Sequence, residues 1–236
     1  MPKLNKGRPE AGDRQWFSVQ AKKGDKAEIF IYDEIGIGYY GGGVAAVDLI
    51  AQVKALNLTA ADELVVRVNS PGGSFFEGNA IYNYLRSLKA KIVVRVEGMA
   101  ASSASLIAMA GDRIEMPENA MMFIHNPWNM VAGDANVMRK MAEDLDKMRD
   151  SAVATYLRRA GDKMNKDDLI EMLDTETWLG AEDAVKFGLA DVVDEPVRAA
   201  AMFDCSKYGF PTPKALVINH AEIRKAQRAQ LEALKV

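Results

Sequence analysis

Short apolar runs alternate with segments of helical periodicity in the first half of the chain. The apolar runs end at turn residues and are rich in β-branched side chains, which predicts buried strands. Strands separated by helices of this length imply right-handed crossovers and a mainly parallel sheet. The pattern therefore predicts an α/β fold. We expect strands at 27–32, 64–69, 91–97, 113–116 and 120–124, and helices at 44–56, 76–89 and 102–110.

The second half is mostly helical. Residues 134–160 predict one long helix, with Asp134 as its N-cap and Gly161 just past its end. It carries a single apolar stripe, and its length of about 40 Å is too great for a body of this size to cover. We therefore expect it to project and pack against another subunit, the alternative being that it folds back over its own sheet. The stripe consists of Val137, Met141, Leu145, Met148, Ala152 and Tyr156; helices at 165–173 and 181–187 and a strand at 189–193 follow.

Composition places the chain among ordinary globular proteins. Its 236 residues are 49% hydrophobic and 27% charged, which excludes a disordered or fibrous chain and fits one domain with short appendages. A single cysteine, Cys205, excludes an internal disulfide and a cysteine-rich metal site. The nearly apolar run at 99–111 is too short to span a bilayer, and the first residues lack an apolar leader segment. We expect a soluble, cytoplasmic protein without a membrane partner.

Basic residues gather at both ends. Residues 1–26 contain seven Lys or Arg against three Asp or Glu, and residues 207–236 contain six against two, although the net charge is −3. We therefore divide the chain into a basic N-terminal arm (1–26), a folded domain (27–195) and a basic C-terminal tail (196–236). Such arms are either solvated or touch an acidic partner. Nothing in the acidic middle suggests base readout, so a nucleic-acid partner is not expected.

A serine lies where a predicted strand meets a helix of small residues, in the segment GMAASSAS at 98–105. A hydroxyl at this junction projects from the carboxyl edge of the sheet, beside free N–H groups that can stabilise an oxyanion. Ser102 is therefore a candidate nucleophile, although a serine N-cap would give the same pattern. His125 ends the run at 120–124 and could activate that hydroxyl, or be only structural. We regard His220 in the tail as incidental.

Two glycine-rich segments follow predicted strands. The turn in NSPGGS at 69–74 can bring its backbone close to a ligand, and could supply a second oxyanion donor, pair with an extended peptide, or be a plain turn. The segment GIGYYGGG at 36–43 has the context of a dinucleotide-binding turn. However, the bulky Tyr39 and Tyr40 fill the positions between the second and third glycines. Such a turn also needs an acidic residue about 20 positions further on, but the next predicted strand begins only at Leu64. We expect a flexible loop near the substrate groove instead.

Four segments together resemble the ClpP peptidases: NSPGG, GMAASSAS, FIHNP and ETWLGAEDAVKFGLAD, in that family's order and with similar spacing from about residue 27 to 193. The resemblance implies a ClpP/crotonase-like fold and a serine endopeptidase. Ser102 would be the nucleophile and His125 the general base, and the N–H groups of Gly73 and Ser103 would form the oxyanion hole. It also implies protein or peptide substrates, a homo-oligomeric ring or stacked rings, and neither metal nor organic cofactor.

The triad acid has two candidates under this resemblance. The family's aspartate shortly precedes a block that begins with an aromatic residue and leucine. Counting back from Trp178 places Glu176 at that position, and Asp174 is the competitor because glutamate lengthens the arm by one methylene. Either carboxylate can orient the imidazole and stabilise its cation. We favour Glu176.

The chain also departs from the usual ClpP pattern. Ser103 and Ala104 follow the nucleophile where ClpP has Met-Gly, the segment from Ser102 to His125 is slightly shorter, and the basic tail is extra. These features are more similar to the ClpP-like proteases of tailed bacteriophages, thought to act in prohead maturation. They argue against dependence on an ATP-driven unfoldase. For a phage protease, a capsid precursor is a possible partner and the host cytoplasm is the expected location.

Three other functions remain open at this stage. A crotonase-type acyl-CoA enzyme also uses two backbone N–H groups to hold an oxyanion, but it would not need Ser102. A catalytically silent assembly or scaffold protein could use the basic arms to bind a capsid precursor. A serine–lysine peptidase would keep its activity without His125.

Overall fold

The computed structural model describes residues 17–21, 26–36 and 43–195. Most of the 36–43 loop, the C-terminal tail, Cys205 and His220 lie outside these residues. The N-terminal arm does not end where the charge pattern placed its boundary. Residues Phe17–Ala21 form strand β1 and pair antiparallel with β2 (Lys26–Ile31), so part of the predicted arm belongs to the sheet.

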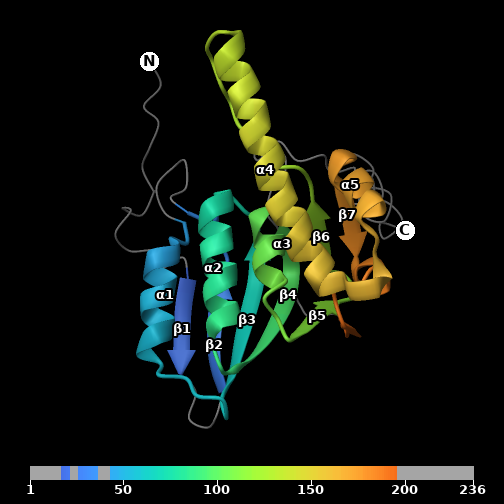
Figure 1. Ribbon diagram of the computed structural model, residues 1–236. Coiled ribbons are helices and arrows are strands. Elements are labelled where there is room, and N and C mark those ends of the chain that lie inside the picture. The colour runs from blue at the N-terminus through green and yellow to red at the C-terminus, as the bar shows by residue number, and fades with distance from the viewer. Residues whose placement is uncertain (1–16, 22–25, 37–42, 196–236) are drawn as a thin grey trace, which may run out of the picture. The chain divides into compact units, whose positions relative to one another are not determined.

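The described residues form an eight-stranded sheet (Figure 1). Its order is β1-β2-β3-β4-β5-β8, while β6 pairs with β4 and β7 pairs with β6. All the pairings except β1–β2 and β6–β7 are parallel. The prediction of a mainly parallel α/β fold is therefore confirmed. The remaining strands are β3 (Glu63–Ser70), β4 (Lys91–Ala101), β5 (Arg113–Pro117), β6 (Met121–Ile124), β7 (Thr177–Gly180) and β8 (Val192–Asp194).

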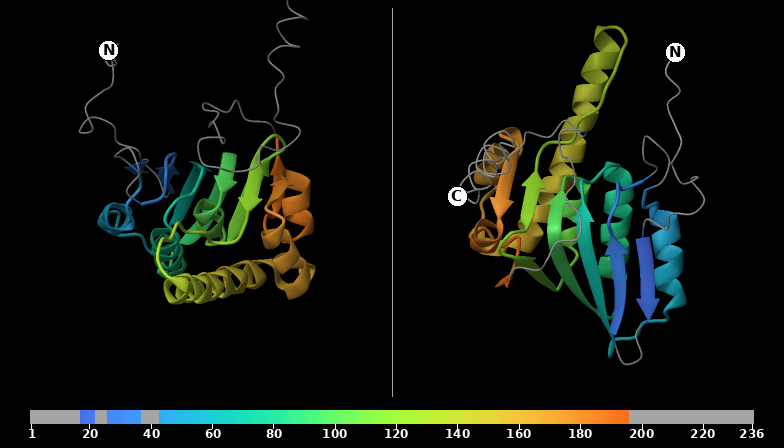
Figure 2. Two further views of the ribbon diagram at one scale, coloured as in Figure 1. Left: turned by 90° about the horizontal axis from the view of Figure 1, so that it is seen from above. Right: turned by 180° about the vertical axis from the view of Figure 1, so that it is seen from behind.

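Helices cover one face of this sheet. The view from behind in Figure 2 shows the strands in front of α1, α2 and α4. The core between the layers consists of fully buried aliphatic side chains, including Ile29, Val66 and Val94 from strands and Leu49 and Leu85 from helices. The helices are α1 (Ala46–Ala55), α2 (Phe75–Ser87), α3 (Ser103–Ala108), α4 (Ala135–Ala160), α5 (Lys166–Asp174) and α6 (Ala181–Lys186).

Strand β4 is longer than the sequence indicated. The predicted strand ended at Glu97 with a turn at Gly98, but β4 continues to Ala101. The extra length is stabilised because Met99, Ala100 and Ala101 pair with β6 after the first part of β4 has paired with β5. The missed strand β7 then pairs antiparallel with β6. These corrections matter because the end of β4 and the β6–β7 ladder carry the candidate catalytic residues.

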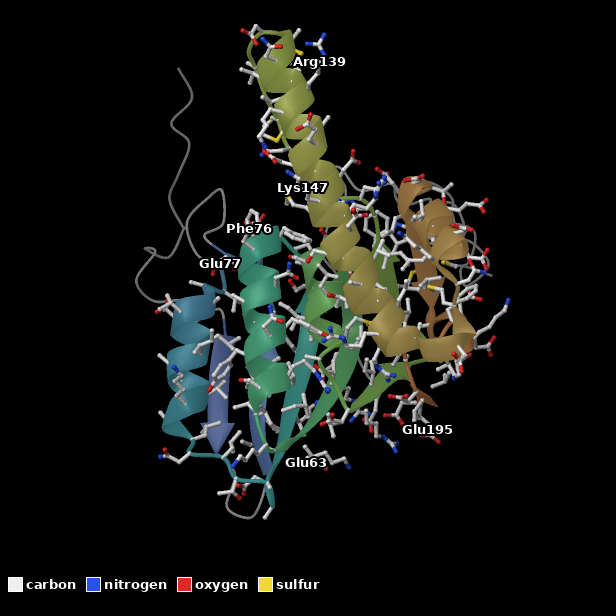
Figure 3. All side chains as sticks on the ribbon, in the orientation of Figure 1. Glu63, Phe76, Glu77, Arg139, Lys147 and Glu195 are labelled. Atoms are coloured by element: carbon white, nitrogen blue, oxygen red, sulfur yellow. The ribbon has the colours of Figure 1, made fainter. Side chains whose placement is uncertain are left out.

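Helix α4 has the caps that the sequence predicted. The Asp134 carboxylate accepts hydrogen bonds from the N–H groups of Asn136 and Val137 at 2.9 and 3.1 Å, and Gly161 ends the helix with a φ of 59°. Only the C-terminal part of α4 is buried, and Val137 near its start is 45% exposed. Figure 3 places Arg139 near the far end of the helix, well beyond the sheet. The helix therefore projects, as predicted, whereas its packing against another subunit stays a prediction.

Within the described residues, no helix has both the length and the apolar character needed to cross a membrane.

Candidate active site

The candidate residues meet at the carboxyl edge of the parallel strands. Phe76 and Glu77, at the start of α2, mark this edge in Figure 3, and Glu63 marks the opposite edge where β3 begins. The parallel ladder pairs Ala100 with Ser70 of β3 and Ala101 with Phe123 of β6. The loops that follow β3 and β6 are thus brought beside the end of β4, where Ser102 lies.

Ser102 adopts a backbone conformation that is unusual for a residue with a side chain, with φ 53° and ψ −128°. Such conformations cost roughly 1–3 kcal/mol and persist only where neighbouring groups enforce them. Here both flanking peptides are held. The Ser102 N–H donates to the Phe123 carbonyl at 2.9 Å, and the Ser102 carbonyl accepts from the Ser105 N–H at 2.9 Å. The strand-to-helix turn therefore presents the hydroxyl in one fixed direction.

His125 faces this hydroxyl. The parallel pairing of β4 with β6 sets Ala101 opposite Phe123, so His125 follows β6 just where Ser102 follows β4. The distance from His125 Nε2 to Ser102 Oγ is 2.8 Å, within hydrogen-bonding range. The two residues that the sequence singled out for proton transfer are therefore in contact.

The imidazole lies in an apolar, aromatic environment. It stacks on Phe123 with the ring centroids 5.1 Å apart, and Trp178 lies against the same phenylalanine at 4.6 Å. Burial lowers the pKa of His125 from its usual 6.5 to about 4, and a backbone hydrogen bond with Asn126 opposes that shift. The imidazole is consequently neutral at pH 7, the form that a general base requires.

The glycine turn after β3 is held tightly against Ser102. The Gly72 N–H donates to Ser70 Oγ at 3.1 Å, and the Gly72 carbonyl accepts from the Ile35 N–H at 2.8 Å. Gly72 has a φ of +87°, and a Cβ at this position would lie 2.7 Å from the Ser102 Cβ. Gly73 has a φ of +148°, and a Cβ there would lie 2.3 Å from the Ile35 carbonyl oxygen. Neither position can accept a side chain without displacing backbone.

Two N–H groups close to Ser102 in the chain or in the adjoining glycine turn remain available. Among the described residues, neither the Gly73 N–H nor the Ser103 N–H takes part in a hydrogen bond, whereas the adjacent Gly72 and Ser74 N–H groups both do. Paired free donors next to a nucleophile are what a tetrahedral oxyanion needs. The two residues predicted for the oxyanion hole therefore lie at the turns that flank Ser102.

The structure does not bring a predicted acid onto His125. Asp174 is exposed, and its Oδ1 accepts a hydrogen bond from Asn126 Nδ2 at 2.6 Å. Glu176 is also exposed, and its carboxylate makes no hydrogen bond or ion pair with any residue that the structure describes. Glu176 lies immediately before β7 and has a φ of 52°, so its backbone does not continue the β6–β7 ladder. The assignment of the acid therefore stays a prediction.

Register nevertheless distinguishes the two carboxylates. The antiparallel β6–β7 ladder pairs Phe123 with Trp178 and Ile124 with Thr177. Continued by one step, this register places Glu176 opposite His125. Asp174 lies beyond that position, next to Asn126.

A pair of hydroxyls near the site was missed by the sequence analysis. Ser105 Oγ lies 2.5 Å from the Ser102 carbonyl oxygen and 2.7 Å from the Tyr156 hydroxyl on α4. The pattern placed Tyr156 in an apolar stripe without assigning its hydroxyl a role. A tyrosine in such a stripe, facing a serine-rich helix, is the one signal that could have suggested the contact.

Together these groups form a nucleophile, a neutral base and two unused hydrogen-bond donors, the parts needed for acyl transfer. Within the part of the chain that the structure describes, no group of three or more His, Cys, Asp or Glu side chains is placed to hold a metal ion.

Most of the chain is similar to one family of known proteins. The family model described as Clp protease matches residues 11–196. The chain is 28% identical over 199 residues to ATP-dependent Clp protease proteolytic subunit 1 of Protochlamydia amoebophila (strain UWE25). This alignment covers 82% of this chain and 92% of that protein. It is 30% identical over 139 residues to the ATP-dependent Clp protease proteolytic subunit of Deinococcus radiodurans, covering 58% of this chain and 67% of that protein.

Proposed function

Because the chain belongs to the Clp protease family, we propose that it is a serine endopeptidase with Ser102 as its nucleophile. The observation that carries this proposal is the 2.8 Å contact between His125 Nε2 and Ser102 Oγ, at a serine whose backbone is held in a strained conformation. A structural serine N-cap would need neither the strain nor the imidazole.

The proposed reaction follows from these positions. His125 removes the hydroxyl proton as Ser102 Oγ attacks the peptide carbonyl carbon, and the carbonyl oxygen becomes an oxyanion held by the Gly73 and Ser103 N–H groups. The imidazolium then protonates the leaving amine and an acyl-enzyme forms. Water, deprotonated by the same imidazole, attacks the ester and releases the acid product and the free serine.

We assign the acid of the triad to Glu176. What supports this choice is the β6–β7 register, which would set Glu176 opposite His125 if the ladder continued by one pair, together with its position before Trp178 in the family motif. To reach the imidazole, the Glu176 backbone must leave its positive φ and extend the ladder by one pair.

Assembly is the next part of the proposal. The exposed half of α4 carries Val137 and Met138, which are 45% and 51% exposed, and apolar side chains of this size favour burial against another surface. We propose that α4 packs against further copies of the chain in a ring or stacked rings whose interior holds the sites. Access to that interior would then restrict cleavage of protein substrates.

The finer assignment is to the cytoplasmic proteases of phage head maturation, with a capsid precursor as partner. Two departures from the usual ClpP sequence support this assignment: Ser103 and Ala104 stand in place of Met-Gly after the nucleophile, and a basic tail is present. The relatives named above are subunits of ATP-dependent proteases. Degradation of a folded substrate that depends on an added Clp ATPase, with no cleavage of capsid precursor alone, would overturn this finer assignment while leaving the peptidase intact.

Hydrolysis of an unfolded protein tests the peptidase itself. The full chain should cleave fluorescein-labelled casein, and Ser102→Ala should abolish cleavage while eluting from a sizing column as the wild type does. The rival crotonase-type function predicts turnover of an acyl-CoA thioester that survives Ser102→Ala. Thioester turnover without casein cleavage would overturn the proposed function.

A further inference from the structure

We propose that Tyr156 and Ser105 are positioning residues that aim the oxyanion-binding N–H of Ser103. This inference rests on the proposed peptidase function and adds to it a device that connects α4 with the nucleophile turn. Three oxygen atoms form the connection: the Tyr156 hydroxyl, the Ser105 hydroxyl and the Ser102 carbonyl.

The direction of the hydrogen bonds follows from the chemistry of the last acceptor. A carbonyl oxygen can only accept, so the Ser105 hydroxyl must donate its single proton to the Ser102 carbonyl at 2.5 Å. Ser105 Oγ can then only accept from Tyr156, whose hydroxyl donates at 2.7 Å. Burial raises the pKa of Tyr156, so its hydroxyl keeps the proton that it donates. The hydrogen bonds therefore run in one direction, from the Tyr156 hydroxyl on α4 through the Ser105 hydroxyl to the Ser102 carbonyl.

The carbonyl at the end of this chain belongs to the peptide that joins Ser102 to Ser103. A trans peptide is planar, and its C=O and N–H point in opposite directions. No peptide bond in the described residues is cis. Holding the Ser102 oxygen on one side therefore fixes the direction of the Ser103 N–H on the other, where the oxyanion forms.

This peptide needs more restraint than an ordinary one. Ser102 has a positive φ of 53°, and among the described residues its carbonyl is held by the Ser105 N–H, at 2.9 Å, and by the Ser105 hydroxyl. Without the hydroxyl chain, the peptide can rotate to relieve the strain at Ser102 and turn the Ser103 N–H away. Ser105 is fully buried and Tyr156 is 2% exposed, so water cannot easily replace either group.

The test distinguishes a loss of oxyanion binding, caused by a misdirected Ser103 N–H, from a general loss of protein stability. For each variant we would measure kcat and KM on an N-acetyl-tripeptidyl aminomethylcoumarin, and Ki for the aldehyde of the same tripeptide, whose hemiacetal oxygen occupies the oxyanion hole. In Tyr156→Phe and in Ser105→Ala we expect kcat to fall roughly 10- to 100-fold with little change in KM. The aldehyde Ki should rise by about the factor by which kcat/KM falls. The double variant should lose little more than the worse single variant, because both changes break one chain.

Tyr82→Phe is the matched control. Tyr82 is also buried, at 4% exposure, but lies on α2 with no hydrogen bond to the nucleophile turn in the described structure. We expect its kcat and aldehyde Ki to equal those of the wild type. If Tyr156→Phe and Ser105→Ala both keep wild-type kcat and aldehyde Ki, the inference is wrong while the peptidase stands. If Ser102→Ala cleaves the same amide as well as the wild type does, the proposed function itself fails.

Discussion

Gly72→Ala tests the close approach between the glycine turn and the nucleophile. A Cβ at this position would lie 2.4 Å from the Ala101 carbonyl oxygen, 2.7 Å from the Ser102 Cβ and 2.9 Å from the Ser103 nitrogen. Two of these atoms are backbone and the third is the first carbon of the nucleophile, so no side-chain rotation can relieve the overlap. The substitution must therefore move the turn at Ser102 or the turn at Gly72.

The cost has two parts. An alanine at a φ of +87° loses about 1–2 kcal/mol from its own backbone. Overpacking against a fixed neighbour costs typically about 1–3 kcal/mol. The free energy of unfolding should thus fall by about 2–5 kcal/mol, which lowers Tm by about 4–20 °C for a domain of this size. Because a displacement near 1 Å can cost a hundredfold in rate, we expect kcat to fall by about that factor.

Two other glycines separate the parts of this cost. Gly161 has a φ of +59°, and a Cβ at this position would have no other atom within 4 Å, so Gly161→Ala should show the backbone cost and a normal kcat. Gly180 also has open space and an ordinary φ of −72°, so Gly180→Ala should change neither stability nor kcat. Thermal unfolding and amide hydrolysis measure the series. A Gly72→Ala protein with the Tm of Gly161→Ala and the kcat of the wild type would refute the reasoning.

Two further predictions concern the base and its acid. Glu176→Gln should lower kcat at least 100-fold and more than Asp174→Asn does, because one further pair of the β6–β7 register would set Glu176, and not Asp174, opposite the imidazole; a larger loss in Asp174→Asn would reverse the assignment. Since burial lowers the pKa of His125 to about 4, serine labelling should persist at pH 7 and through most of the window between pH 6.5, the ordinary pKa of histidine, and pH 4, where it should fall to half. In that window the unfolded chain, with a pKa near 6.5, binds a proton that the folded chain does not, so the free energy of unfolding also falls as the pH drops towards 4. A His125→Gln variant should show a shallower fall of stability in a pH titration, and a wild-type labelling midpoint at pH 6.5 or above would contradict the lowered pKa of the buried imidazole.

The fold could be predicted because each buried strand is a short apolar run that ends at turn residues. The bounds of the long helix could also be predicted, because Asp134 and Gly161 cap its ends through contacts with residues close to them in the chain. Two features could not be predicted from the local pattern: the extension of β4 past Gly98 and the four-residue strand β7. Both depend on pairing with β6, and the residues of a short segment do not indicate which strand will pair with it.

The candidate site divides in the same way. Ser102 stands out because it lies where a predicted strand meets a helix, and His125 because it is one of two histidines and ends an apolar run. The structure places the two side chains in contact. The Ser105–Tyr156 hydrogen bond joins residues 51 positions apart and arises only where α4 crosses α3. The side-chain position of Glu176 could not be read either, because it depends on a single backbone φ where β7 begins.

Intact-mass analysis after treatment with a fluorophosphonate tests the central claim most directly, because the probe reacts only with an activated serine. We predict one covalent adduct per chain on the wild type, mapped to Ser102, and none on Ser102→Ala or His125→Ala at equal probe concentration. A correctly assembled wild-type protein that forms no adduct, or a His125→Ala variant labelled at the wild-type rate, would contradict activation of Ser102 by His125.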